Sequence, residues 1–112
     1  MAPRLRAAGL RVARETTVCD DQDEVAQAVR EALGRSEILI ISGGLGPTFD
    51  DLTRESVAVA TGRTLSYDAA LFERIRRQFL RYRLSIPANN KRQAWVLAGA
   101  RVLWNARGSA PG

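Results

Sequence analysis

Apolar residues recur with a strand-like spacing in some segments of the chain and with a helix-like spacing in others. This pattern predicts strands that alternate with helices. Residues 10–18 mix polar and β-branched side chains in partial alternation, which is typical of a strand with one exposed face. Residues 37–42 form a short unbroken apolar run, which favours a strand buried on both faces of a parallel sheet. A third, short strand is expected at residues 101–103.

The first two helices are predicted from capping residues as well as from apolar spacing. Asp21 and Glu24 form a D-x-x-E pattern that indicates a helix N-terminus, and Gly34 is expected to end that helix. Its inner stripe is predicted to contain five apolar residues, Val25, Ala28, Val29, Ala32 and Leu33. A second helix is expected from about residue 53 to residue 60, with Gly62 just beyond its end.

Two more helices are expected further along the chain. One covers about residues 68–83, with an inner face formed by Leu71, Phe72, Ile75, Phe79 and Tyr82. The other covers about residues 90–98 and is expected to begin with a capping box between Asn90 and Gln93. Strands that alternate with helices predict an α/β fold with right-handed crossovers.

The composition excludes several classes of protein. The chain has 112 residues, enough for one domain or part of one, and 46% of them are hydrophobic, as in a globular protein. Histidine is absent, which removes Ser-His-Asp and Cys-His catalysis and His-type zinc sites. The single cysteine, Cys19, excludes an internal disulfide framework and suits a reducing compartment. No apolar run resembles a membrane span or a signal peptide, so we expect a cytoplasmic protein with no membrane partner.

The charge balance favours an anionic partner. Seventeen Arg and Lys residues against twelve Asp and Glu residues give a formal net charge of +5, and every basic residue except Lys91 is an arginine. Such a charge suits nucleotides and other phosphates. The basic run from Arg74 to Arg83 raises the alternative of nucleic-acid binding. Such a run is more commonly the solvated face of a helix, so we do not expect nucleic acid to be the partner.

The stretch from Ser42 to Thr53 carries most of the chemical information. It follows the predicted buried strand and leads into a predicted helix, which is where ligands bind in open α/β sheets. The backbone N–H groups of Gly43, Gly44 and Gly46 can approach a phosphate closely, and the helix N-terminus adds positive potential. The turn matches neither a P-loop nor a dinucleotide fingerprint, so on spacing alone a simple tight turn remains the alternative.

Two groups of acidic residues follow predicted strands. Asp50 and Asp51 come after the glycine turn, where they could cap a helix, hold Mg²⁺ against a pyrophosphate or position a water molecule. Asp20 and Asp21 follow the strand at 10–18. Because the carboxyl ends of parallel strands share one edge of a sheet, we expect Asp20 and Asp51 to face the same crevice, with Asp21 used as a helix cap.

Four blocks of sequence match the motifs of one known family, in order and at similar spacing. They are GGLGPTFDDLTRE at residues 43–55, Val18-Cys19-Asp20, residues 87–94 and residues 105–112. The first resembles the signature T-G-G-L-G-P-T-x-D-D-x-T-x-E, and the others resemble V-G-D, P-x-x-N-x-K-Q-A and N-x-x-G-T-A-P-G. Together they resemble the CinA (competence/damage-inducible protein) branch of the molybdopterin-binding fold family. Cys19 stands where that family has glycine, and Arg92 where it has lysine.

This resemblance implies a three-layer α/β/α fold with a mainly parallel sheet. In the CinA branch it implies Mg²⁺-dependent hydrolysis of a nucleotide diphosphate such as ADP-ribose, with Asp20 and Asp51 as catalytic residues and the metal on Asp50 and Asp51. The ligand, a phosphate-containing small molecule, would contact Gly43, Gly44, Gly46, Thr48, Thr53 and Asn90. The alternative is a molybdopterin-binding module of the molybdenum-cofactor biosynthesis type, which binds a pterin phosphate without hydrolysing it.

The resemblance also has two departures. The family begins with a strand and a G-[DN]-E motif, and it continues beyond A-P-G to an L-P-G-x-P segment; this sequence contains neither. We therefore expect residues 1–112 to form a single partial domain of the CinA N-terminal type, without an amidase domain. The strand at 37–42 would then lack one neighbour, so we also expect the chain to form a homo-oligomer.

Overall fold

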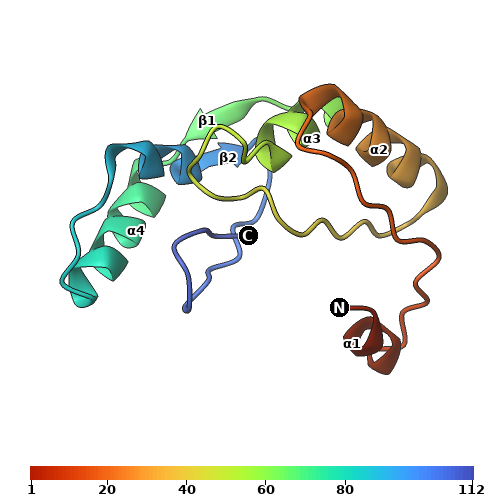
Figure 1. Ribbon diagram of the computed structural model, residues 1–112, viewed down its shortest axis with the longest axis horizontal. Coiled ribbons are helices and arrows are strands. Elements are labelled where there is room, and N and C mark those ends of the chain that lie inside the picture. Colours follow the sequence, from red (N-terminus) through yellow and green to blue (C-terminus); the bar gives the residue numbers. More distant parts are fainter.

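The computed structural model describes residues 1–112 and combines helices with one short sheet (Figure 1). Its elements, in chain order, are α1 (Ala2–Ala7), α2 (Gln22–Arg35), α3 (Thr53–Thr61), β1 (Leu65–Tyr67), α4 (Ala69–Arg81), the 3₁₀ helix η1 (Ala88–Ala94) and β2 (Trp95–Leu97). The expected mixed α/β class is confirmed, although β1 and β2 are the only strands formed.

The sheet consists of β1 and β2, which pair in antiparallel fashion. Ser66 lies opposite Val96, and Tyr67 lies opposite Trp95. The Tyr67 ring packs against Trp95 and against Phe72 of α4, with ring centroids 5.9 and 6.2 Å away. Separations of this size are typical of stabilising aromatic pairs. The sheet therefore ties the start of α4 to the segment that follows η1.

The three strands predicted from the hydrophobic pattern do not form, and these predictions are wrong. Residues 11–18 and 37–42 make no backbone–backbone hydrogen bond, and in 101–103 only Leu103 is paired, through two bonds of 2.6 and 2.8 Å with Gly112. An apolar pattern can place a segment in a sheet only if a second backbone supplies the donors and acceptors of a ladder. The segments at 10–18 and 37–42 have no such neighbour in this chain.

The helices predicted from local signals are confirmed with small shifts. The Asp21 side chain caps α2 by accepting hydrogen bonds of 3.0 Å from the N–H groups of Asp23 and Glu24. Gly62 adopts a left-handed conformation, with φ of +67°, and ends α3 as expected. Gly34 does not end its helix, because α2 continues through it by one residue.

The helix predicted at 90–98 is wrong. The chain forms η1 and then turns directly into β2, with Pro87 as the residue that precedes the 3₁₀ helix. The expected capping box is also wrong, because Asn90 lies inside η1 and its Nδ2 donates to Oε1 of Gln93 at 2.7 Å. The N-x-x-Q spacing therefore produces a bond between two side chains instead of a helix cap.

The core is small and lies in two places. α2 packs on α3, and α4 packs on η1; the buried apolar residues are Ala26, Val29, Ala32, Leu71, Ile75 and Ala94. Two residues predicted on inner helix faces are exposed instead, Leu33 by 49% and Tyr82 by 65%, because each lies near or beyond the end of its helix. Only 11 of 112 residues are buried, so few side chains hold the elements together.

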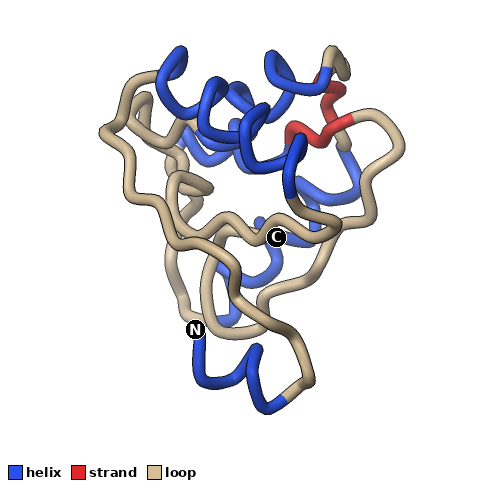
Figure 2. The backbone as a smooth tube through the Cα atoms, turned by 90° about the vertical axis from the view of Figure 1, so that its right-hand side faces the viewer, coloured by secondary structure: helices blue, strands red, loops and turns tan.

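The arrangement is open. The radius of gyration is 15.2 Å, whereas a compact chain of this length has about 13 Å. α1 lies apart from the other helices in both views and contains no buried residue (Figures 1 and 2). Figure 2 shows how much of the chain is loop, including the two long segments that lead into α2 and α3. No helix has the length and apolar character needed to cross a membrane.

Candidate functional site

The glycine turn that follows residues 37–42 is held by Thr53, the first residue of α3. The Thr53 hydroxyl donates to the carbonyl oxygen of Gly43 at 2.8 Å, and the Thr53 N–H donates to that of Gly44 at 3.1 Å. Gly43 and Gly44 have φ of +92° and +64°, which favours glycine. A Cβ on Gly44 would lie 3.2 Å from the Thr53 Cβ and closer still to its hydroxyl. Backbone conformation and the neighbouring threonine therefore both require glycine at residue 44.

Asp51 closes the second half of the turn. Its Oδ2 accepts hydrogen bonds from the Thr48 N–H at 3.0 Å and from the Thr48 hydroxyl at 2.7 Å. The hydroxyl bond is the main reason that the pKa of the Asp51 carboxyl lies below its usual value, in spite of partial desolvation. A Cβ on Gly46 would lie 2.8 Å from the Asp51 Cγ, so this close approach depends on glycine. The carboxylate of Asp51 is thus engaged by its own loop.

Arg54 anchors the same loop from the body of α3. Its side chain donates to the carbonyl oxygens of Leu45 at 2.9 Å and Gly46 at 3.1 Å. Arg54 is buried, and this burial is the largest cause of the lowered pKa of its guanidinium. A buried guanidinium is stabilised only when its donors are used, so these two bonds fix the loop in place. Asp51 and Glu55 supply nearby negative charge that opposes the shift.

Arg92 of η1 is the second arginine that anchors the loop. It forms an ion pair with Glu55 of α3 at 2.9 Å and donates to the carbonyl oxygens of Thr48 and Asp51. The side chains of Arg92 and Glu55 are 31% and 28% exposed, so the pair is partly shielded from water. Two arginines therefore hold residues 45–51: Arg54 of α3 contacts the start of this loop, and Arg92 of η1 contacts its later part.

A small cavity of about 140 Å³ brings the two predicted turns together. One wall comes from Val18, Cys19 and Asp20, and the other from Ser42, Gly43, Gly44 and Thr53. The ends of the segments 10–18 and 37–42 thus meet at one crevice, although neither segment is a strand. Asp51 is not part of its lining, because its carboxylate is directed at Thr48.

The candidate ligand residues therefore fall into two groups. Those that line the cavity are Asp20, Gly43, Gly44 and Thr53. Those that do not are Gly46, Thr48, Asp50, Asp51 and Asn90. Gly46, Thr48 and Asp51 form the loop beside the cavity, and Asp50 is an exposed residue of that loop. The structure thus joins the glycine turn to Asp20 and leaves the Asp50–Asp51 pair outside.

Asn90 belongs to a buried polar chain. It is 3% exposed and bonds to Gln93, whose Nε2 in turn reaches the Ser109 hydroxyl at 3.3 Å. These contacts join η1 to the C-terminal segment. Buried amides need such partners, because an unpaired amide is costly away from water. Asn90 therefore holds the side chain of Gln93, and Gln93 connects η1 to the C-terminal segment.

The distribution of carboxylates limits how a metal could bind. The chain contains no group of three or more Cys, Asp and Glu side chains close enough together to hold a metal ion. Asp20 is the only charged residue that lines the cavity. A Mg²⁺ ion at this place would have to take further oxygen ligands from the bound molecule, as Mg²⁺ often does with phosphates.

Sequence reasoning missed the two arginines that shape the loop. Arg54 stands inside the matched T-x-E block, and Arg92 replaces the lysine of the P-x-x-N-x-K-Q-A block. The family motif has a basic residue at this position, and this indicated that the Arg92 side chain makes a specific contact. No local pattern pointed to Arg54, whose importance depends on its burial against the loop.

The glycine turn, its arginine anchors and the two segments that meet beside it all lie within a domain of known type. Residues 1–106 match the family model described as "Probable molybdopterin binding domain". The chain belongs to this family.

The similar proteins point to its CinA branch. The chain is 47% identical over 112 residues to a "CinA-like protein" of Acidobacterium capsulatum and 44% identical over 112 residues to one of Thermotoga neapolitana. The matched region includes all of this chain but only 27% and 28% of the length of those two proteins. The crystal structure of a CinA protein of unknown function from Thermoplasma acidophilum is 35% identical, with a TM-score of 0.86 over 99% of this chain and 64% of that one. The resemblance to CinA and the fold class are thereby confirmed.

Proposed function

We propose that this chain supplies the phosphate-binding turn of a CinA-type domain that hydrolyses a nucleotide diphosphate, such as ADP-ribose, with Mg²⁺. The observation that carries the proposal is the cavity in which Asp20 faces Gly43, Gly44 and Thr53. Family membership supports a phosphate-bearing small molecule as the ligand, since molybdopterin itself carries a phosphate.

The cavity suits a phosphate group better than a whole nucleotide. Its volume of about 140 Å³ is below the roughly 300–1,000 Å³ of pockets that enclose small molecules. The N–H groups of Gly43 and Gly44 donate to no acceptor of the chain, so they are free to bind an anion. The N-terminus of α3, a helix of nine residues, adds positive potential at Thr53. The rest of a nucleotide would extend out of the cavity.

The single negative charge in the lining supports a cation as a companion of the phosphate. Asp20 would repel a phosphate bound beside it, unless a cation lay between them. The carboxylate of Asp20 and the hydroxyl groups of Ser42 and Thr53 are hard oxygen donors, which fit Mg²⁺. When bound there, Mg²⁺ would neutralise phosphate charge and polarise a phosphoryl oxygen.

The two aspartates have different roles in this proposal. The Asp20 side chain is exposed and makes no hydrogen bond within the chain, so it is free to hold the cation or to orient a water molecule. Asp51 acts through the loop, because its hydrogen bonds with Thr48 fix the backbone next to Gly46. Asp50 is exposed on that loop and is the remaining carboxylate that could reach a ligand from outside the cavity.

A second candidate function is binding of molybdopterin without hydrolysis. The description of the matching family favours it directly. The same phosphate-binding turn would serve both functions, because each ligand carries a phosphate on a larger organic group. The two differ in whether a bond is broken, so one assay separates them.

The experiment measures release of AMP from ADP-ribose, with and without Mg²⁺, together with equilibrium binding of ADP-ribose. We expect Asp20→Asn to reduce AMP release at least tenfold. Asp23→Asn is the matched control, because it removes one negative charge from an exposed residue at the start of α2, outside the cavity.

The outcomes separate the alternatives. Binding that is sensitive to Asp20→Asn, without any AMP release, would favour the binding module. Hydrolysis equally unaffected by both substitutions would refute a role for this cavity.

A further inference from the structure

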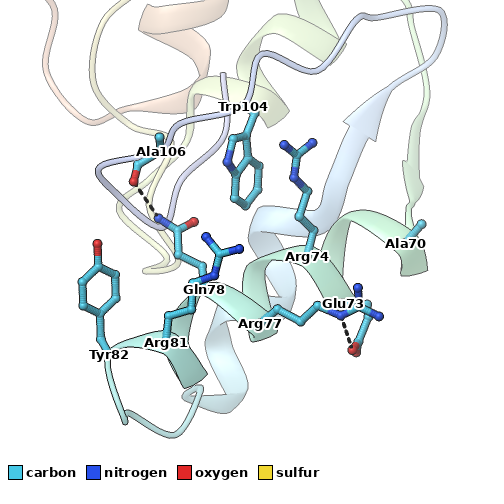
Figure 3. Close-up of a pocket in the computed structure, with 9 residues that line it drawn as sticks. All are labelled: Ala70, Glu73, Arg74, Arg77, Gln78, Arg81, Tyr82, Trp104 and Ala106. Atoms are coloured by element: carbon cyan, nitrogen blue, oxygen red, sulfur yellow. Dashed lines mark hydrogen bonds and ion pairs between the residues drawn. The ribbon is translucent and has the colours of Figure 1, made fainter.

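A second cavity lies between α4 and the C-terminal segment (Figure 3). It has a volume of about 560 Å³ and shares no lining residue with the cavity at Asp20. Its volume lies within the roughly 300–1,000 Å³ typical of pockets for small molecules. We refer to it as the α4 cavity. The function proposed above makes no use of it.

Three arginines of α4 line one side of the α4 cavity. Arg74, Arg77 and Arg81 are spaced by three and four residues, which places them on one face of the helix (Figure 3). All three are exposed, and the side chains of Arg74 and Arg81 form no ion pair and no hydrogen bond within the chain. The lining of the cavity therefore contains three positive charges, and these charges would stabilise an anion bound in it.

The one acid in the lining does not offset this charge. Glu73 receives two hydrogen bonds of 2.8 Å from Arg76, which lies outside the lining, and one of 3.2 Å from Arg77. Because Arg76 supplies most of its pairing, the guanidinium of Arg77 keeps donors that Glu73 does not use. The α4 cavity therefore retains an excess of positive charge.

The far wall of the α4 cavity positions one of the arginines. The Arg74 guanidinium lies 4.0 Å from the centre of the Trp104 ring, a cation–π contact that orients it. Gln78 donates from Nε2 to the carbonyl oxygen of Ala106 at 3.3 Å, which joins α4 to the C-terminal segment beside the cavity (Figure 3). A guanidinium stacked on a ring leaves its N–H edge available, and that edge matches phosphate or carboxylate oxygens.

We propose that the α4 cavity is a second ligand site, which binds a small polyanion with two or more phosphate or carboxylate groups. Arg77 and Arg81 contact the anionic groups, and Arg74 contacts them from its place on Trp104. The limited volume favours a small molecule over a polymer. This inference does not depend on the function proposed for the Asp20 cavity, because the two cavities have no residue in common.

The test uses the fluorescence of Trp104 in a Trp95→Phe background, since the chain has two tryptophans. Pyrophosphate and citrate are the probes, one for phosphate and one for carboxylate. We expect a saturable change in fluorescence with at least one of them. The double substitution Arg77→Gln, Arg81→Gln should weaken it at least tenfold. The matched control is Arg4→Gln, Arg6→Gln, which removes the same charge from exposed residues of α1.

Circular dichroism checks that each variant is folded, and calorimetric titration of the unsubstituted chain repeats the binding measurement without the Trp95 substitution. Binding lost in the α4 double variant and retained in the α1 double variant supports the proposal. Absence of binding of both probes overturns it, as does equal weakening in the two double variants. A single-stranded 12-nucleotide DNA that binds at lower concentration than either probe, through the same arginines, would also overturn it in favour of nucleic acid.

Discussion

Arg92 and Glu55 lie 37 residues apart in the sequence and form an ion pair of 2.9 Å that joins η1 to α3. The same guanidinium donates to carbonyl oxygens of the loop between the glycine turn and α3. η1, which packs on α4, and α3, which packs on α2, are thereby joined beside the candidate site. We therefore expect both the stability of the folded chain and the conformation of this loop to depend on Arg92.

We expect Arg92→Met to lower the free energy of unfolding by about 1.5–3 kcal/mol, the range for hydrogen bonds to charged groups. The matched control is Arg76→Met, which breaks the exposed pair with Glu73, whose side chains are 44% and 40% exposed. That change should cost clearly less than Arg92→Met, because ion pairs exposed to water contribute little to stability. Urea unfolding measures both. Equal losses in the two variants would mean that the Arg92 pair contributes no more than a surface pair.

Gly44 offers a sharper test of the turn. Gly44→Ala places a Cβ in a left-handed conformation and against Thr53, so we expect a loss of about 1–3 kcal/mol. Gly34→Ala is the control, because a Cβ there meets nothing within 4 Å and the residue lies inside α2. It should stabilise the chain by about 0.5–1 kcal/mol. Thermal unfolding would contradict the assignment if both substitutions shifted the midpoint in the same direction.

The lowered pKa of Asp51 predicts a dependence of stability on pH. A carboxyl whose pKa is lower in the folded chain stabilises it above the unfolded pKa, near 3.8, and loses that contribution as pH falls through the folded pKa. The difference in unfolding free energy between the unsubstituted chain and Asp51→Asn should therefore be constant at neutral pH and shrink below about pH 4.

The unfolding free energies of the unsubstituted chain and of Asp51→Asn have to be subtracted, because Glu73 titrates in the same pH range. The hydrogen bonds from Arg76 lower the pKa of Glu73 to about 2. Since Glu73 is present in both chains, its effect cancels. A difference between the two chains that grew on acidification would contradict the sign expected for Asp51.

Local signals in the sequence predicted the parts of this structure that depend on neighbouring residues only. Asp21 caps α2 and Gly62 ends α3 because each acts within one turn of its own helix. The 37–42 run could not be placed in the same way, because a strand also needs a second backbone. The hydrophobic pattern shows which residues are apolar, but it does not show which backbone segment would pair with them.

The same distinction applies to the candidate site. Its glycine turn could be located from the sequence, because positive φ at Gly43 and Gly44 is a property of the turn itself. The Thr48 hydroxyl that directs the Asp51 side chain lies three residues away in the same loop. The loop also depends on the burial of Arg54 and on the contacts of Arg92 from η1. Burial and contacts between distant residues are set by packing between segments, which no local pattern encodes.

The exposed apolar residues at 37–42 lead to the last prediction. Ile38 and Ile40 are 60% and 46% exposed, and the backbone of their segment makes no backbone hydrogen bond. Such a segment can pair with another chain, which supports the expected homo-oligomer. We expect sedimentation to show self-association that increases with concentration, and Ile40→Lys to reduce it. Val59→Lys is the control, because Val59 is equally exposed at 46% but lies in α3, where the helix uses its own backbone groups. A chain that remains monomeric at all concentrations, or self-association reduced equally by both substitutions, would show that this segment does not drive assembly.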